Sequence, residues 1–84
     1  MNSKQRKTLE AVFANPISGT IEWVAIESLL VSVGCRVSEG AGSRVRFDCR
    51  GVMLAVHRPH PRKEAKPYQV KAVRELLVKL EIKP

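Results

Sequence analysis

Apolar residues recur with a helical period as far as Gly34, and after Cys35 they alternate with polar residues along the chain. In the segment 44–50, Val45, Phe47 and Cys49 alternate with charged side chains. Such alternation predicts a β-strand with one apolar face. Gly51 then marks the tip of a hairpin, and residues 52–57 form the returning strand. The chain must therefore combine helices with a small antiparallel sheet.

The tip of this hairpin determines which residues face each other. A two-residue tip at Arg50-Gly51 gives three apolar cross-strand pairs, which are Cys49 with Val52, Phe47 with Leu54, and Val45 with Val56. The opposite face then carries Arg44, Arg46, Asp48, Met53, Ala55 and His57. A four-residue tip shifts the partners by one pair but leaves both faces unchanged.

Two helices are expected before the hairpin. Ser3 can cap the first helix, and Asn15-Pro16 ends it, because proline disfavours helical geometry in the residue before it. Thr20 can cap the second helix, and Gly34 closes it at the C′ position. The apolar stripe of this second helix consists of Trp23, Ile26, Leu30 and Val33.

A short strand is expected at residues 36–39, and residues 58–66 form a basic loop broken by prolines. Pro67 favours the start of a last helix, whose apolar stripe is Val70, Val73, Leu77 and Leu80. The predicted fold class is α+β in the order helix, helix, strand, strand, strand, helix. Helices are expected to cover one face of a three-stranded antiparallel sheet, in a single domain spanning residues 1–84.

Positive charge is concentrated in the second half of the chain. Between Arg44 and Arg74 there are nine Lys and Arg residues against two acidic ones, whereas the rest of the chain has six of each. A local basic surface on a neutral scaffold is typical of a protein that binds a polyanion. The alternative is a charged surface that only keeps the protein in solution.

The two cysteines, Cys35 and Cys49, lack the spacing of metal ligands. Cys49 falls on the apolar face of the hairpin and is expected to fill the core, while Cys35 has no evident base partner. So few cysteines favour a reducing compartment. No apolar run has the length of a signal peptide or a bilayer span. We therefore expect a cytoplasmic protein with no membrane contact, no metal and no small-molecule cofactor.

Two histidines are candidates for chemistry on RNA. With a two-residue tip, His57 lies directly across from Arg44, so that a neutral imidazole can take a proton from a 2′-hydroxyl while the arginine stabilises charge on the phosphate. His60 is held between two prolines in the basic loop. The alternatives are that His57 simply ends a strand and that His60 is an ordinary loop residue. Tyr68 is the aromatic residue best placed to stack on a base.

The segments Gly42-Ser43-Arg44-Val45-Arg46-Phe47 and 57–64 (HRPHPRKE) resemble the HicA family of toxins from bacterial toxin–antitoxin modules. The resemblance runs from about residue 22 to residue 82, and it makes residues 1–16 a helical extension of a core at 20–82. It implies a fold like that of double-stranded-RNA-binding domains, cleavage or blocking of messenger RNA, and a HicB-type antitoxin protein as partner, so that we expect an endoribonuclease toxin. Gly42 and Ser43 match the family's Gly-Ser-His motif, and His60 matches the histidine of its last loop.

One position departs from the family motif, since Arg44 stands where the family has its catalytic histidine. Arginine stays protonated near neutral pH and cannot act as a general base. We therefore predict that His57 or His60 supplies the proton transfer, with Arg44 as the third catalytic residue. The predicted RNA-binding residues are Ser43, Arg44, Arg46, Arg58, Arg62, Lys63, Lys66, Tyr68 and Lys71. The alternatives are an RNA-binding module without nuclease activity and a protein that only docks an antitoxin.

Overall fold

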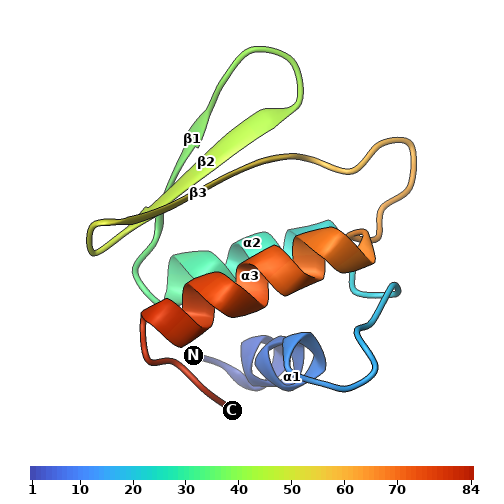
Figure 1. Ribbon diagram of the computed structural model, residues 1–84, viewed down its shortest axis with the longest axis vertical. Coiled ribbons are helices and arrows are strands. Elements are labelled where there is room, and N and C mark those ends of the chain that lie inside the picture. Colours follow the sequence, from blue (N-terminus) through green and yellow to red (C-terminus); the bar gives the residue numbers. More distant parts are fainter.

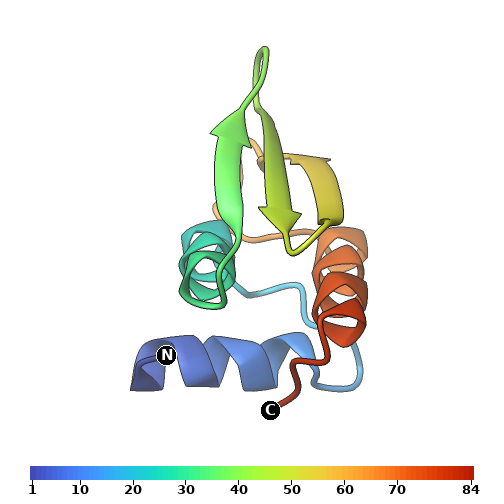
Figure 2. The same cartoon turned by 90° about the vertical axis from the view of Figure 1, so that its left-hand side faces the viewer.

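The computed structural model describes all 84 residues. Its elements are α1 (Ser3–Val12), α2 (Trp23–Ser32), β1 (Arg36–Glu39), β2 (Arg44–Cys49), β3 (Val52–His57) and α3 (Pro67–Lys79). The strands form one antiparallel sheet in the order β1-β2-β3. Figure 1 shows α2 and α3 under this sheet, and Figure 2 separates them, with α2 below β1, α3 below β3, and α1 crossing beneath both helices on the side away from the sheet. The predicted α+β class, element order and one-sided helical cover are confirmed.

The hairpin has the predicted register. Arg44 pairs with His57 and Cys49 pairs with Val52, so only Arg50 and Gly51 remain at the tip. Both tip residues have positive φ angles, 47° at Arg50 and 82° at Gly51. This is the geometry of a type I′ turn, whose twist matches that of the flanking strands.

The core lies between the inner face of the sheet and the helices. Phe47 is fully buried there, and its ring centroid lies 6.2 Å from that of Trp23 at the start of α2. The apolar stripe predicted for the last helix is buried as well. No helix of the protein combines the length and the apolar character needed to cross a bilayer.

Gly34 follows the C-cap of α2 as predicted, but both predicted N-terminal helix caps are wrong, by one and two residues. Asn2, and not Ser3, caps α1, because its side chain accepts a hydrogen bond from the backbone N–H of Gln5. The second helix begins at Trp23, three residues after Thr20. Residues 21–22 are held extended instead, since the backbone N–H of Trp23 donates to the carbonyl of residue 63 and that of residue 65 donates to the carbonyl of residue 21, both at 2.8 Å. The basic loop is thereby fastened to the start of α2.

Cys35 and Cys49 form a disulfide. The antiparallel register explains their meeting, because both stand one residue beyond the cross-strand pair Arg36–Asp48 and therefore face each other. Cys49 is in the core as predicted, 1% exposed, but it is bonded to Cys35 and does not act as a free apolar side chain. The bond ties the chain just after α2 to the end of β2.

Reducing this disulfide is expected to lower the free energy of unfolding by about 3 kcal/mol, because the bond closes a loop across a sequence separation of 14 residues. Urea unfolding of the wild-type protein with and without a phosphine reductant measures the difference. The double variant Cys35→Ala/Cys49→Ala serves as the control and should not respond to the reductant. A wild-type midpoint that is the same under both conditions would contradict the assignment.

Candidate nucleic-acid interface

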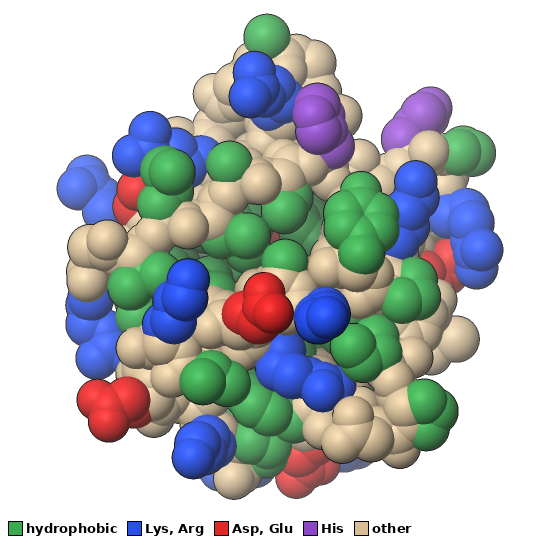
Figure 3. Space-filling view, in the orientation of Figure 1, with side chains coloured by type: hydrophobic (Ala, Val, Ile, Leu, Met, Phe, Trp, Pro, Cys, Tyr) green, Lys and Arg blue, Asp and Glu red, His purple; other side chains and the backbone are tan.

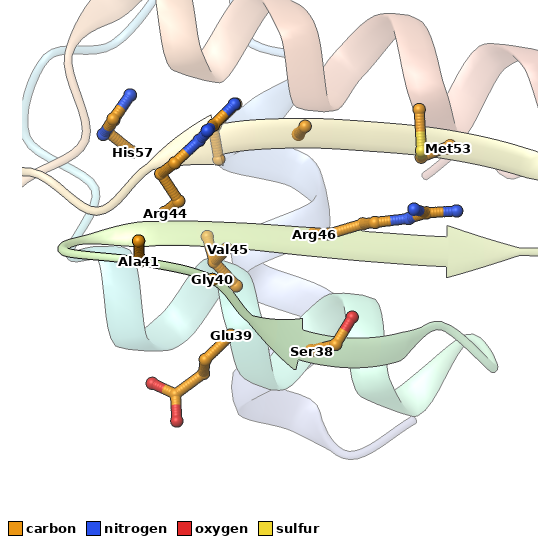
Figure 4. A pocket seen from close by; sticks show the side chains of 11 residues that line it. Ser38, Glu39, Gly40, Ala41, Arg44, Val45, Arg46, Met53 and His57 are labelled. Carbon is orange, nitrogen blue, oxygen red and sulfur yellow. The ribbon is translucent and has the colours of Figure 1, made fainter.

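The face of the sheet turned away from the helices is hollowed. A cavity of about 370 Å³ opens there, lined by residues of all three strands and of the turn that joins β1 to β2. Figure 4 shows Arg44 and His57 next to each other on neighbouring strands, with Arg46 and Met53 farther along the same face. Ala55 lies across from Arg46, and its small side chain leaves the middle of the hollow open.

Three polar side chains converge at one end of this hollow. His57 is the last residue of β3 and is paired with Arg44, the first residue of β2. The hydroxyl oxygen of Ser43 lies 3.3 Å from Nδ1 of His57, within hydrogen-bonding distance. All three residues are exposed to solvent. The permanently charged guanidinium of Arg44, the hydroxyl of Ser43 and the imidazole of His57 thus lie together on an open surface.

The turn before β2 sets the position of Ser43. Gly42 has a φ of 66°, a left-handed conformation that residues with a side chain rarely adopt, and an added Cβ would meet no other atom within 4 Å. Glycine is therefore favoured here by backbone conformation and not by lack of space. The carbonyl of Ser43 then accepts a hydrogen bond of 2.8 Å from the backbone N–H of Arg58, which joins this turn to the end of β3.

Arg58 makes contacts inside the protein instead of facing the hollow. Its guanidinium lies 2.8 Å from a carboxylate oxygen of Glu27 on α2 and also contacts Glu39 at the end of β1. The hydrogen bonds that Arg58 donates, first to Glu27 and then to Glu39, raise its pKa above the already high usual value. Glu27 also accepts a hydrogen bond from the indole N–H of Trp23. We therefore assign Arg58 a structural role and leave it out of the proposed RNA surface.

Several other basic side chains of this half of the chain are engaged away from the sheet face. Arg74 of α3 donates to the carbonyls of Val12 and Ala14 at the end of α1, and Arg50 donates to the carbonyl of Leu80. Figure 3 accordingly shows Lys and Arg side chains spread over the molecule from the sheet to the lowest helix. The positive charge is therefore less concentrated on the sheet than the sequence predicts, because three of the nine basic residues, Arg50, Arg58 and Arg74, bind other parts of the fold.

The two histidines lie in different places. His57 lines the hollow of the sheet face, whereas His60 is exposed in the basic loop and lines a separate cavity of about 240 Å³ with Arg62 and Lys66. Nowhere do three or more His, Cys, Asp or Glu side chains come together in a way that could hold a metal ion. Of the three predicted catalytic residues, the structure brings together Arg44 and His57 only.

The remaining predicted contact residues follow the chain from the hollow toward α3. Arg62 lies 3.6 Å from Glu64 in an exposed pair, and Lys63, Lys66 and Lys71 have no ion-pair partner. The Tyr68 side chain is 64% exposed at the start of α3. These side chains belong to the basic loop and to the start of α3, and none of them lines the hollow of the sheet face.

Gln69 is a residue of this region that the sequence analysis missed. It is buried, and its side chain donates a hydrogen bond of 2.7 Å to the backbone carbonyl of His57. A signal was present, because glutamine three residues after a helix cap is typical of a capping box. The contact to the strand could not be read from that pattern, since it joins residues 12 positions apart.

An open sheet face with an arginine beside an imidazole, on a small α+β domain backed by helices, defines a protein suited to bind and act on a polyanion. The model of a protein family described as the HicA toxin of bacterial toxin–antitoxin matches residues 23–80, which is 58 of the 84 residues. The chain therefore belongs to the HicA toxin family and is the toxin of a toxin–antitoxin pair. Neither the curated proteins nor the solved structures contain a match to the chain.

Proposed function

We propose that this toxin binds messenger RNA on the open face of its sheet and cleaves the RNA backbone without a metal. The observation that carries the proposal is the pairing of Arg44 with His57, whose Nδ1 lies 3.3 Å from the hydroxyl of Ser43. Membership of the HicA family supports action on a cellular target that halts growth.

The proposed reaction uses the 2′-hydroxyl of the RNA itself. In neutral His57, Nδ1–H donates to the Ser43 hydroxyl, which leaves Nε2 free to accept the 2′-hydroxyl proton. The 2′-oxygen then attacks the adjacent phosphorus and the bond to the 5′-oxygen breaks, with solvent supplying the proton to the leaving oxygen. The products are a 2′,3′-cyclic phosphate and a 5′-hydroxyl. Arg44 stabilises the negative charge that develops on the phosphate oxygens.

The RNA strand is proposed to run from the hollow toward α3. Arg44 and Arg46 bind phosphates on the sheet, and the lysines and Tyr68 beyond the loop bind the continuing strand. Arg46 is held near Asp48 at 3.1 Å, but this pair is exposed and therefore weak enough to exchange its partner for a phosphate.

A second candidate function is RNA binding without cleavage. It is favoured by Arg44, which takes the place of the motif histidine and cannot act as a base. The basic face is also a natural docking site for an acidic HicB-type antitoxin, and such docking would cover the proposed site and block RNA.

Replacing Ala55 by phenylalanine tests the site directly, because the added ring fills the middle of the hollow between the strands. Phenylalanine is well tolerated on an exposed strand, so the fold should persist. We expect RNA affinity, measured by fluorescence anisotropy with a labelled oligoribonucleotide, to fall about tenfold or more, because the RNA would lose its contacts with the hollow.

Val24→Phe is the matched control, because it adds a ring to another exposed position, on α2 and outside the hollow, where Val24 is 71% exposed. This variant should bind RNA as the wild type does. Equal affinity of the Ala55→Phe variant and the wild-type protein would place the RNA elsewhere. Wild-type protein that binds RNA but never shortens it would decide for the second candidate.

A further inference from the structure

Gln69 is the one buried polar residue of the protein, with 1% of its surface exposed. Both ends of its side-chain amide are used. Its oxygen accepts a hydrogen bond of 2.8 Å from the backbone N–H of Lys66, which caps α3, and its nitrogen donates a bond of 2.7 Å to the carbonyl of His57. The amide therefore joins the first turn of α3 to the last residue of β3.

The orientation of this amide follows from its partners. A backbone N–H can only donate and a carbonyl can only accept, so the side-chain oxygen must face Lys66 and the nitrogen must face His57. A carboxylate at position 69 would keep the contact with Lys66 and would set one oxygen against another at His57.

The peptide group between His57 and Arg58 is fixed at both ends. Gln69 binds its carbonyl, and the carbonyl of Ser43 accepts a hydrogen bond of 2.8 Å from its N–H. The same Ser43 contacts the imidazole ring through its hydroxyl. The plane of this peptide determines the direction in which the His57 side chain leaves the backbone, on a sheet face that no helix covers.

We infer that Gln69 is a positioning residue, which holds the His57 imidazole in place for proton transfer without touching the RNA. The inference rests on the proposed function. A displacement of a catalytic group by about 1 Å can cost as much as 10²-fold in rate. Without the Gln69 amide nitrogen, the cleavage rate should therefore fall by about 10- to 100-fold, while the phosphate contacts that give RNA affinity remain.

The variant Gln69→Glu removes the donor and keeps the helix cap. Gln5→Glu is its matched control, because Gln5 occupies the same position in α1: its oxygen caps the Asn2 backbone N–H at 2.9 Å and its nitrogen donates to Ser28 at 3.0 Å. Single-turnover cleavage and RNA affinity are measured for both variants, with the ¹⁵N shifts of the His57 ring as a readout independent of cleavage.

We expect Gln69→Glu to slow cleavage about tenfold or more at nearly unchanged RNA affinity and to change the tautomer populations of His57, with neither effect in Gln5→Glu. A folded Gln69→Glu variant with wild-type cleavage and wild-type His57 shifts would overturn the inference. Should Gln69→Glu fail to fold, Gln69→Met against Gln5→Met repeats the comparison with an apolar side chain of similar length. Wild-type protein that does not cleave RNA refutes the proposed function instead, and the His57 shifts still decide whether Gln69 positions the ring.

Discussion

Replacing His57 by alanine is expected to slow RNA cleavage by about 10²- to 10⁴-fold, the usual contribution of a positioned general base. RNA affinity should change little, because Arg44 and Arg46 remain in the hollow. Single-turnover cleavage of a labelled RNA, with excess protein and EDTA, measures the rate, and arrest of bacterial growth on induction gives the corresponding result in cells.

His60→Ala separates the two histidines, because His60 lines a different cavity from that of Arg44 and His57. We expect this variant to keep most of the cleavage rate. The opposite result, in which His60→Ala is inactive and His57→Ala is active, would assign proton transfer to the histidine that matches the family's loop position. Unchanged cleavage in the variant that lacks both histidines would end the proposed mechanism.

Replacing Phe47 by alanine is expected to lower the free energy of unfolding by about 3–5 kcal/mol. Phe47 is the largest fully buried side chain, and it packs the middle of the sheet onto Trp23 of α2. Native proteins are typically stable by only about 5–15 kcal/mol, and a domain of this size lies toward the lower end, so a large fraction of the variant should be unfolded near physiological temperature.

Urea unfolding followed by circular dichroism measures this loss. Met53→Ala, on the opposite face of the neighbouring strand, is the control, because Met53 is 54% exposed and should contribute less than about 0.5 kcal/mol. A loss below about 1 kcal/mol for Phe47→Ala would contradict the position of the core beneath the sheet.

The hairpin and its two faces could be predicted from local pattern alone. Val45, Phe47 and Cys49 alternate with charged residues, and Arg50-Gly51 supplies a tip that fixes the register. A shift by one residue would have buried the arginines, so only one arrangement of the faces was compatible with a core. The position of His57 beside Arg44 follows from this register.

The start of α2 could not be predicted in the same way. Thr20 has good local capping chemistry, but residues 21–22 stay extended, because backbone hydrogen bonds join residues 21 and 23 to residues 65 and 63. Partners about 40 positions away overrode the local preference. Such contacts have no signature in a window of neighbouring residues.

The roles of Arg58 and Gln69 could not be predicted either, because the partners of both side chains lie far away along the chain. Counting charges assigned Arg58 to the basic surface, whereas Glu27, 31 positions away, binds its guanidinium. Cys35 and Cys49 are different, because extending the register of the first two strands by one residue would have paired them. The disulfide could therefore have been predicted from the sequence.

RNA is proposed to lie on the sheet face that the helices leave open. Titrating ¹⁵N-labelled protein with an RNA made uncleavable by 2′-O-methyl groups tests this by the shifts of the backbone amides. We predict the largest changes at Ser43, Arg44, Arg46, Ala55 and His57, with smaller ones at the start of α3. Changes concentrated on α1 and the outer side of α2, with the strands unaffected, would contradict it.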